Sequence, residues 1–190
     1  MSDNGFPDMK GAGWIEVICG SMFSGKTESL IMRLRLAQIA RKKVIIFVPK
    51  KDNRYGEGVI ASHDARSLPG LVVETAGEIL ELSGEAQVVG VDESQFFGLD
   101  LVEVCEELAN QGKRVIVAGL DQDWRGLPFE PMPSLLCVAE SITKKLAVCV
   151  DCGRPANRSQ RIVASKARIV VGEKDVYKAR CRRCFERPKE

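Results

Sequence analysis

The sequence contains no long apolar run and has almost no net charge. None of its hydrophobic segments approaches the ~20 apolar residues that a membrane-spanning helix needs, so we expect no membrane contact. A formal net charge of +2 is too small to indicate nucleic acid as a partner. Residues 1–5 have neither the basic nor the apolar region of a signal peptide, which predicts a flexible lead-in over residues 1–13 and a cytoplasmic location.

Internal repeats and low-complexity tracts are also absent, and the composition is that of an ordinary soluble globular protein. The 190 residues are 45% hydrophobic and 28% charged, enough for one α/β domain and a small appendage. Apolar runs alternate with segments of helical period, which favours a parallel sheet with helices on both faces. The predicted strands cover residues 14–19, 44–48, 88–91 and 115–118, and the predicted helices cover residues 28–41, 76–82, 99–111 and 135–141. Residues 50–69 are polar and rich in turn formers, and we expect a loop, either near the site or on the solvated surface.

A phosphate-binding motif, here called the phosphate loop, connects the first predicted strand to the first predicted helix. Residues 20–27 read G-S-M-F-S-G-K-T and fit G-x-x-x-x-G-K-[ST], with the required strand and helix on either side. Glycine lets backbone N–H groups approach phosphate oxygens, Lys26 can reach the outer phosphates, and the Thr27 hydroxyl can bind magnesium. The alternative is a glycine-rich turn with a chance lysine. The residues predicted to bind the nucleoside triphosphate are Gly20, Ser21, Met22, Phe23, Ser24, Gly25, Lys26 and Thr27.

The third predicted strand ends in the acidic pair Asp92-Glu93. An aspartate at this end of the sheet can hold Mg²⁺ together with the Thr27 hydroxyl. Successive strand residues point to opposite sides, so we expect Glu93 to serve a second site, as the base on an acceptor hydroxyl. Two alternatives stay open: the glutamate of an ATPase positions a water molecule, and two carboxylates at a strand end can simply be solvated.

Two adjacent aromatic residues, Phe96 and Phe97, follow this acidic pair. Two rings just past the sheet edge cannot both enter the same core face, so one of them can stack on a nucleotide base. The alternative, of equal weight, is that both rings anchor the next helix.

Four of the seven cysteines form two C-x-x-C pairs near the C-terminus, Cys149 with Cys152 and Cys181 with Cys184. This pattern predicts a Cys₄ structural zinc site, and the alternative is a set of redox dithiols. Four protein ligands leave no open position on the metal, so the zinc is not expected to be catalytic. We expect it to fix both ends of the 28 residues between the pairs, residues 153–180, so that this segment closes over a ligand.

The remaining cysteines and the basic C-terminal tail are interpreted as structural features. Cys19, Cys105 and Cys137 stand singly in apolar surroundings and are predicted to be buried thiols. The tail is predicted to be a solvated face and not a nucleic-acid surface, because no row of aromatic residues accompanies its charges. Its basic residues are Lys178, Arg180, Arg182, Arg183, Arg187 and Lys189.

In combination, these motifs resemble the thymidine kinases of the zinc-containing, cytosolic type. The resemblance rests on residues 20–27, on the hexapeptide D-E-S-Q-F-F at residues 92–97 and on the two cysteine pairs, and it covers nearly the whole chain. It implies a P-loop NTPase-type α/β fold: a parallel sheet flanked by helices over residues 14–144, with a small C-terminal zinc-binding (lasso) domain over residues 145–190. Further matching segments are Asp52-x-Arg54-Tyr55, His63-Asp64, Leu120-Asp121 and Pro128-Phe129.

The resemblance also implies an activity and its residues. Such a kinase transfers the γ-phosphate of ATP to the 5′-hydroxyl of thymidine to give dTMP, with Glu93 as the base and with Asp92 and Gln95 beside the phosphates. Its zinc is structural and its magnesium enters with ATP. The family is usually a homotetramer that dTTP inhibits. The residues expected around thymidine are Met22, Phe96, Leu120, Trp124, Phe129, Ser159, Arg168, Ile169, Val170, Val171, Gly172 and Tyr177.

Four positions depart from the family pattern. Trp124 stands where phenylalanine is usual, Ser94 where alanine or glycine is more frequent, and Arg168 where a smaller residue is common. Cys184 replaces a histidine of many bacterial members, and either residue can bind zinc. Two other classes stay open: a nucleic-acid-dependent ATPase with a zinc ribbon, which the low charge and short chain disfavour, and a nucleotide-responsive binding protein, which the intact motif residues disfavour.

Overall fold

A six-stranded parallel sheet forms the centre of the protein in the computed structural model, which describes residues 11–50, 59–61, 67–164, 167, 170 and 175–187. The strand order is β5-β2-β6-β7-β1-β8, and every neighbouring pair is parallel. The strands are β1 Trp14–Gly20, β2 Val44–Pro49, β5 Leu71–Val73, β6 Val88–Val91, β7 Arg114–Gly119 and β8 Ser141–Lys145. The helices are α1 Lys26–Ile39, α2 Ala76–Leu82, α3 Asp100–Asn110 and α4 Met132–Val138. Among the described residues, no helix combines the length and apolar character needed to cross a membrane.

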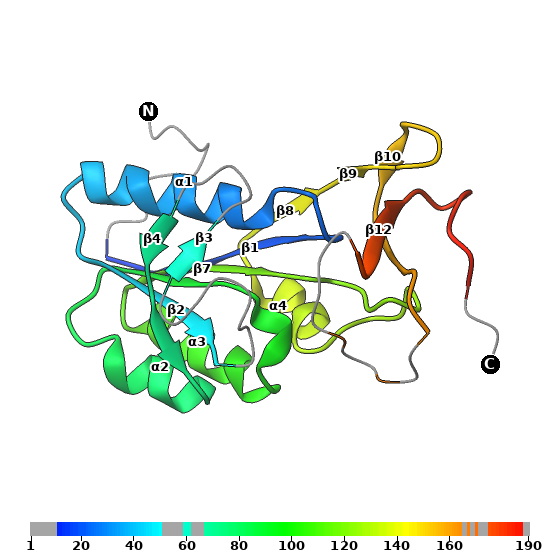
Figure 1. Ribbon diagram of the computed structural model, residues 1–190. Coiled ribbons are helices and arrows are strands. Elements are labelled where there is room, and N and C mark those ends of the chain that lie inside the picture. The colour runs from blue at the N-terminus through cyan, green and yellow to red at the C-terminus, as the bar shows by residue number, and fades with distance from the viewer. Residues whose placement is uncertain are drawn as a thin grey trace.

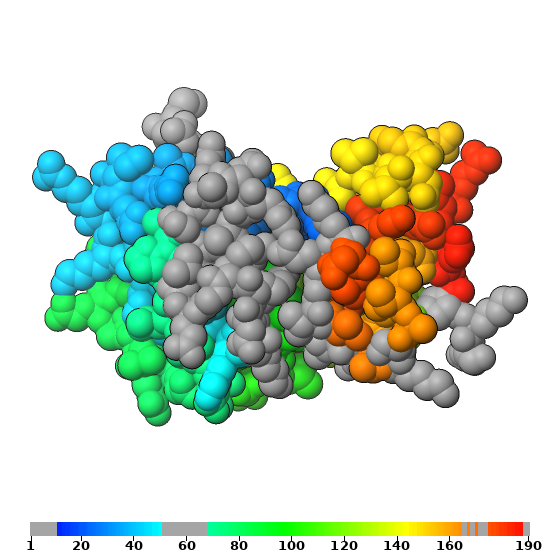
Figure 2. Space-filling model, in the orientation of Figure 1, coloured from blue at the N-terminus to red at the C-terminus, as the bar shows by residue number. Residues whose placement is uncertain are grey.

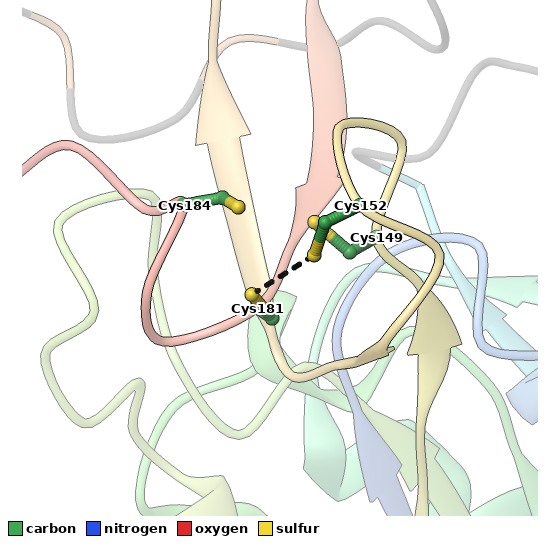
Figure 3. A group of neighbouring side chains, drawn as sticks. All are labelled: Cys149, Cys152, Cys181 and Cys184. Carbon is green, nitrogen blue, oxygen red and sulfur yellow. Dashed lines mark hydrogen bonds between the residues drawn. The ribbon is translucent and has the colours of Figure 1, made fainter.

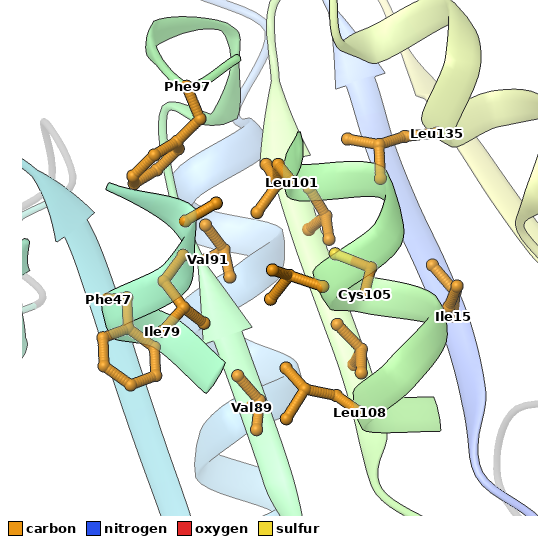
Figure 4. Packing of buried hydrophobic residues seen from close by; sticks show 14 of the residues in the cluster. Ile15, Phe47, Ile79, Val89, Val91, Phe97, Leu101, Cys105, Leu108 and Leu135 are labelled. Atoms are coloured by element: carbon orange, nitrogen blue, oxygen red, sulfur yellow. The ribbon is translucent and has the colours of Figure 1, made fainter. Parts of the chain in front are cut away.

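Helix α1 covers one face of the sheet, and α2, α3 and α4 cover the other (Figure 1). Because both faces are covered, the central strands are apolar throughout, so that Val17 and Ile18 are both fully buried, in different clusters. The predicted parallel sheet flanked by helices is therefore confirmed. The larger core cluster includes Ile15, Phe47, Ile79, Val89, Val91, Phe97, Leu101, Cys105, Leu108 and Leu135 (Figure 4). The cluster beneath α1 includes Ile18, Leu30, Leu34, Ile46 and Ile116.

The two edge strands of the sheet, β5 and β8, were not predicted, and their exposure explains why. β5 is short, and β8 alternates half-buried with exposed residues and has a neighbour on one side only. Its sequence, Ser-Ile-Thr-Lys-Lys, therefore lacks the continuous apolar run of a central strand. The helix predicted over residues 135–141 begins earlier, at Met132, and ends at Val138, so that Ser141 already belongs to β8.

The predicted loop over residues 50–69 contains an antiparallel ribbon. Its strands are β3 Val59–Ala61 and β4 Ser67–Pro69. Residues 51–58 and 62–66 lie outside the described residues, as do the first ten residues of the predicted lead-in. A loop was expected over all of residues 50–69, and the two strands of this ribbon were not predicted.

Two of the three single cysteines are buried as predicted, and the third is not. Cys19 on β1 and Cys105 on α3 lie in the larger core cluster, where burial raises the pKa of Cys105 to about 12. Cys137 is exposed because it follows the buried Leu135 by two positions and therefore lies on the opposite side of α4.

The described residues of the C-terminal part of the chain, between Leu146 and Arg187, form a lobe at one end of the molecule (Figure 2, yellow to red). We call it the C-terminal lobe. It contains two antiparallel pairs, β9 Ala147–Val148 with β10 Pro155–Ala156, and β11 Arg158–Arg161 with β12 Tyr177–Arg180. Arg180, one of the basic tail residues, forms ion pairs with Asp151 at 2.8 Å and with Glu186 at 3.0 Å. The core of the lobe consists of Ala147, Cys149, Ala156, Ala179 and Cys181.

Candidate active site

The phosphate loop forms a tight connection between β1 and α1. Two glycines are required there. Gly20 has φ 145°, and a Cβ atom on it would lie 2.3 Å from the carbonyl oxygen of Lys145, while Gly25 has φ 77° at the start of α1. Lys26 is only 8% exposed, and its Nζ donates to the carbonyl oxygen of Ser21 at 2.9 Å. The lysine thus lies across the loop whose N–H groups are predicted to bind phosphate.

Asp92 follows β6 and meets the first residues of α1. It is 4% exposed, its N–H donates to the carbonyl oxygen of Phe47 at 3.0 Å, and its carboxylate accepts a hydrogen bond from Thr27. Burial raises the pKa of Asp92 to about 7 and the charge of Glu93 adds to this rise, whereas the two hydrogen bonds it accepts and the charge of Lys26 oppose it. A carboxylate and a hydroxyl in contact are oxygen ligands of the kind that Mg²⁺ prefers, so these residues fit the ion.

Glu93 does not continue the strand. Its φ of 47° is left-handed, and it begins the short 3-10 helix η1 Ser94–Phe96. The alternation of side chains along a strand is therefore not the reason that Glu93 and Asp92 can serve different sites. The turn after β6 determines the direction of the Glu93 side chain instead. A left-handed φ costs a residue other than glycine about 1–2 kcal/mol. Strain of this kind is concentrated at functional sites.

Gln95 holds the side chain of Glu93 in place. Its Nε2 donates to Oε2 of Glu93 at 2.5 Å, and its Oε1 accepts the N–H of Leu120 at 2.9 Å. The glutamine is 3% exposed. Since Leu120 directly follows β7, Gln95 ties the end of β6 to the end of the neighbouring strand. The family resemblance implies that Gln95 lies beside the phosphates, and no sequence signal marks its contact with the predicted base.

Phe96 and Phe97 have different environments. Phe97 is buried in the larger core cluster, whereas Phe96 is half-buried. Phe97 therefore packs against the sheet and α3, and the ring of Phe96 stays partly accessible. Phe97 is thus the ring that packs in the core, and the stacking of Phe96 on a nucleotide base stays a prediction.

Four of the residues expected around thymidine lie in or next to the phosphate loop or near the end of β7. They are Met22, Ser159, Leu120 and Phe129. Met22 donates its N–H to Ser159 Oγ at 3.0 Å, which joins the loop to β11. Phe129 is buried, and its N–H donates to the carbonyl oxygen of Asp121, next to Leu120, at 3.2 Å. The expected residues Arg168, Ile169, Val171 and Gly172 lie outside the described residues.

Arg161, which no sequence signal marked, contacts two of the residues expected around thymidine, Trp124 and Tyr177. Its guanidinium lies over the ring of Trp124, with Cζ 4.2 Å from the centroid, and Nη1 donates to the carbonyl oxygen of Ala167 at 2.6 Å. The Tyr177 hydroxyl donates to the carbonyl oxygen of Val170 at 2.9 Å. Arg161 and Tyr177 face each other across β11 and β12. Together they hold the backbone between the cysteine pairs at two positions.

The four paired cysteines meet in the C-terminal lobe (Figure 3). Their Sγ atoms all lie within 4.8 Å of one another, and those of Cys152 and Cys181 are 3.6 Å apart. Tetrahedral zinc with Zn–S bonds of about 2.3 Å needs sulfur atoms about 3.8 Å apart, so the cluster fits zinc. Burial raises the pKa of Cys149, but backbone hydrogen bonds, first that of the Cys181 N–H, outweigh it and lower this pKa to about 6. The lowered pKa of Cys149 favours the thiolate, which is the form that binds metal, whereas hydrogen bonds with Cys152 and Cys181 raise the pKa of Cys184 to about 12, so that metal binding must displace its proton.

These features define a class of protein. A parallel sheet with helices on both faces, a glycine-dependent phosphate loop after its first strand and a four-cysteine cluster beside that loop are those of a P-loop-type α/β protein with a zinc-binding lobe.

Comparison with known proteins gives the family within this class. The model of the thymidine kinase family matches residues 13–185. The chain is 58% identical over 177 residues to the thymidine kinase of Rhodothermus sp. (strain ITI 518), covering 93% of this chain and 83% of the relative. It is 52% identical over 175 residues to that of Bdellovibrio bacteriovorus, covering 92% and 86%, and 50% identical over 185 residues to that of Porphyromonas gingivalis, covering 97% and 91%. The chain belongs to the thymidine kinase family.

Proposed function

We propose that this protein is an ATP-dependent thymidine kinase, which transfers the γ-phosphate of ATP to the 5′-hydroxyl of thymidine and forms dTMP. The observation that carries the proposal is the hydrogen bond by which Gln95 fixes the side chain of Glu93, the residue that directly follows Asp92 and its contact with Thr27. The chain's membership of the thymidine kinase family supports the choice of substrate. This arrangement supports a fixed carboxylate next to the place where ATP and its magnesium would bind.

Each residue of the site has one task in this reaction. The N–H groups of the phosphate loop and Nζ of Lys26 stabilise the negative charge of the transferring phosphoryl group. Asp92 and Thr27 hold magnesium, which when bound neutralises charge on the phosphate oxygens. Glu93 accepts the proton of the 5′-hydroxyl. The oxygen of that hydroxyl bonds to the γ-phosphorus, the bond from the γ-phosphorus to the oxygen that bridges it to the β-phosphate breaks, and ADP leaves.

Thymidine is proposed to lie between the phosphate loop and the backbone that Arg161 and Tyr177 hold. The partly accessible ring of Phe96 and the stacked ring of Trp124 supply flat apolar surface for the base. A close contact with the 5-methyl group is worth only about 1–3 kcal/mol. Deoxyuridine is therefore expected to be a weaker substrate that is still phosphorylated, and purine nucleosides are expected to be excluded by the closed segment.

The family resemblance further supports a structural zinc ion, a homotetramer and inhibition by dTTP. On the outer side of α1, Met32, Leu36 and Ile39 are apolar and exposed, which provides a surface for self-association. For the feedback inhibitor, the thymine base and the triphosphate of dTTP match the two sites proposed for thymidine and ATP.

The experiment that tests this function is ATP turnover with magnesium, with and without thymidine, in which both ADP and the nucleoside monophosphate are measured. We expect ADP release that depends on thymidine, with one dTMP formed for each ADP. Hydrolysis that proceeds without thymidine, or that DNA or RNA stimulates, would contradict the proposal and favour the ATPase alternative.

A further inference from the structure

The first four residues of the phosphate loop all contact the end of β8 or the C-terminal lobe. The close approach at Gly20 is the first of these contacts. The Ser21 hydroxyl donates to the carbonyl oxygen of Ala156 at 3.3 Å, and the Met22 N–H donates to Ser159 Oγ at 3.0 Å. The loop is thus supported from outside the sheet by residues more than a hundred positions away in the chain.

The fourth contact comes from a side chain that the phosphate motif does not specify. Phe23 packs against the core of the C-terminal lobe, in which Cys149 and Cys181 are buried. Its φ of 64° is left-handed, a conformation that costs a residue other than glycine about 1–2 kcal/mol. Such a backbone persists only where surrounding contacts hold it. The packing of the Phe23 ring on the cysteine-bearing core is a contact of this kind.

The core that Phe23 contacts has little apolar surface of its own. Apart from Val176 and Tyr177, the buried apolar side chains described in the lobe are alanines and cysteines, so we expect its fold to depend on the metal that the cysteines fit. Zinc at the cysteine cluster therefore determines the stability of the apolar core that the Phe23 ring contacts. The buried residues of this core are Ala147, Cys149, Ala156, Ala179 and Cys181.

We propose that Phe23 is a positioning residue that couples the two sites, so that zinc at the cysteine cluster holds the phosphate loop in its nucleotide-binding conformation. Zinc then increases the affinity for ATP itself, in addition to fixing the ends of the segment between the cysteine pairs. The inference rests on the proposed function in one respect, namely that the loop binds ATP.

The first test measures Mg-ATP binding to the full zinc-loaded chain by calorimetry, without thymidine. We expect Phe23→Ala to weaken ATP binding about tenfold or more, and Phe23→Leu, which keeps an apolar contact, to restore most of it. In turnover assays, the KM for ATP should rise more than kcat falls. Val148→Ala on β9 is the matched control, because Val148 is 68% exposed, and it should bind ATP like the wild type.

The second test removes zinc with a chelator. The wild type should lose ATP affinity by a similar factor, whereas Phe23→Ala should lose clearly less, because its apolar contact with the lobe is already gone and only the hydrogen bonds of Ser21 and Met22 remain to be lost. In the wild type, zinc removal should also speed amide hydrogen exchange at residues 20–24 and leave β6 unchanged. This exchange measurement decides the matter if Phe23→Ala does not fold.

Three outcomes would overturn the coupling. They are equal ATP affinity in wild type and Phe23→Ala at full zinc content, an equal loss of affinity in both on zinc removal, and unchanged exchange in the loop. A zinc-loaded wild type that does not bind ATP would instead contradict the proposed function, so the two failures are distinguishable.

Discussion

Gln95 binds Glu93 through the nitrogen of its side-chain amide because the oxygen of that amide is taken by the N–H of Leu120. A backbone N–H can only donate, so the amide orientation is determined and its nitrogen must face the carboxylate. The glutamate consequently accepts a hydrogen bond at Oε2, so the site fixes the direction of the proposed base.

Removal of the carboxylate of Glu93 should stop proton transfer and leave nucleotide binding in place. We expect Glu93→Gln to lower kcat by about 10²-fold or more, the usual contribution of a general base. Calorimetry with Mg-ATP provides the control, since its affinity should stay close to that of the wild type. Near-normal turnover in this variant would remove Glu93 from the role of base.

Two replacements of Gln95 should separate the effect of positioning the Glu93 carboxylate from the effect of a charge beside it. Gln95→Met removes the amide without adding charge, and we expect kcat to fall by about 10- to 100-fold because the carboxylate is no longer fixed, with only a small upward shift of the acidic limb of the pH profile. Gln95→Glu places a like charge beside Glu93, so the base stays protonated to a higher pH and the acidic limb of the kcat profile should move upward. Identical pH profiles for both variants would contradict this assignment.

Binding of Mg-ATP should release a proton from Asp92. Burial raises the pKa of this carboxyl to about 7, so below that pH the free protein holds a proton that metal binding must displace. The affinity for Mg-ATP should therefore increase about tenfold from pH 6 to pH 8. Calorimetry in two buffers of different ionisation enthalpy measures the released proton, and Asp92→Asn should lose that release. A variant that releases as many protons as the wild type would assign the proton to another group.

A buried glutamate on β1 that pairs with two arginines should make stability depend on acid pH. Glu16, whose side chain is 4% exposed, contacts Arg33 at 2.7 Å and Arg114 at 2.6 Å. Burial raises the pKa of Glu16, but the hydrogen bond and charge of Arg114, together with Trp14 and Arg33, lower it below 4.5 overall. The carboxylate therefore stabilises the fold above its unfolded pKa, and this contribution is lost as the pH falls through the lower pKa of the folded state.

Urea unfolding of Glu16→Gln tests this prediction. We expect the variant to lose about 1.5–3 kcal/mol of unfolding free energy at pH 7, since two half-buried arginines lose charged hydrogen bonds to their partner. The difference from the wild type should shrink as the pH falls below the unfolded pKa of 4.5, because the unfolded glutamate binds a proton first and the folded one only at its lower pKa. Glu85→Gln is the control, because the Glu85–Lys43 pair is exposed and should contribute little. A difference that stays constant down to pH 3 would contradict the prediction.

The sequence predicted those parts of the site that depend on neighbours in the chain. The phosphate loop and each cysteine pair are short motifs, and their local geometry follows from residue types at fixed spacing. The contacts of Gln95 with Leu120 and of Arg161 with Trp124 were missed, because they join segments that are distant in the chain and have no spacing to recognise. The left-handed turn at Glu93 was missed for another reason: alternation assumes that a strand continues, and β6 ends at Val91.

Strand β8 connects the central sheet directly to the C-terminal lobe. It pairs with β1 along the sheet edge and leads, after a single residue, into β9 of the C-terminal lobe. A fragment that stops before Ser141 would leave the hydrogen-bonding groups of β1 open to a second chain, and an edge of that kind promotes aggregation. The lobe is therefore a poor candidate for excision or exchange between relatives at this boundary, and a chimera has a better prospect if β8 is transferred with it.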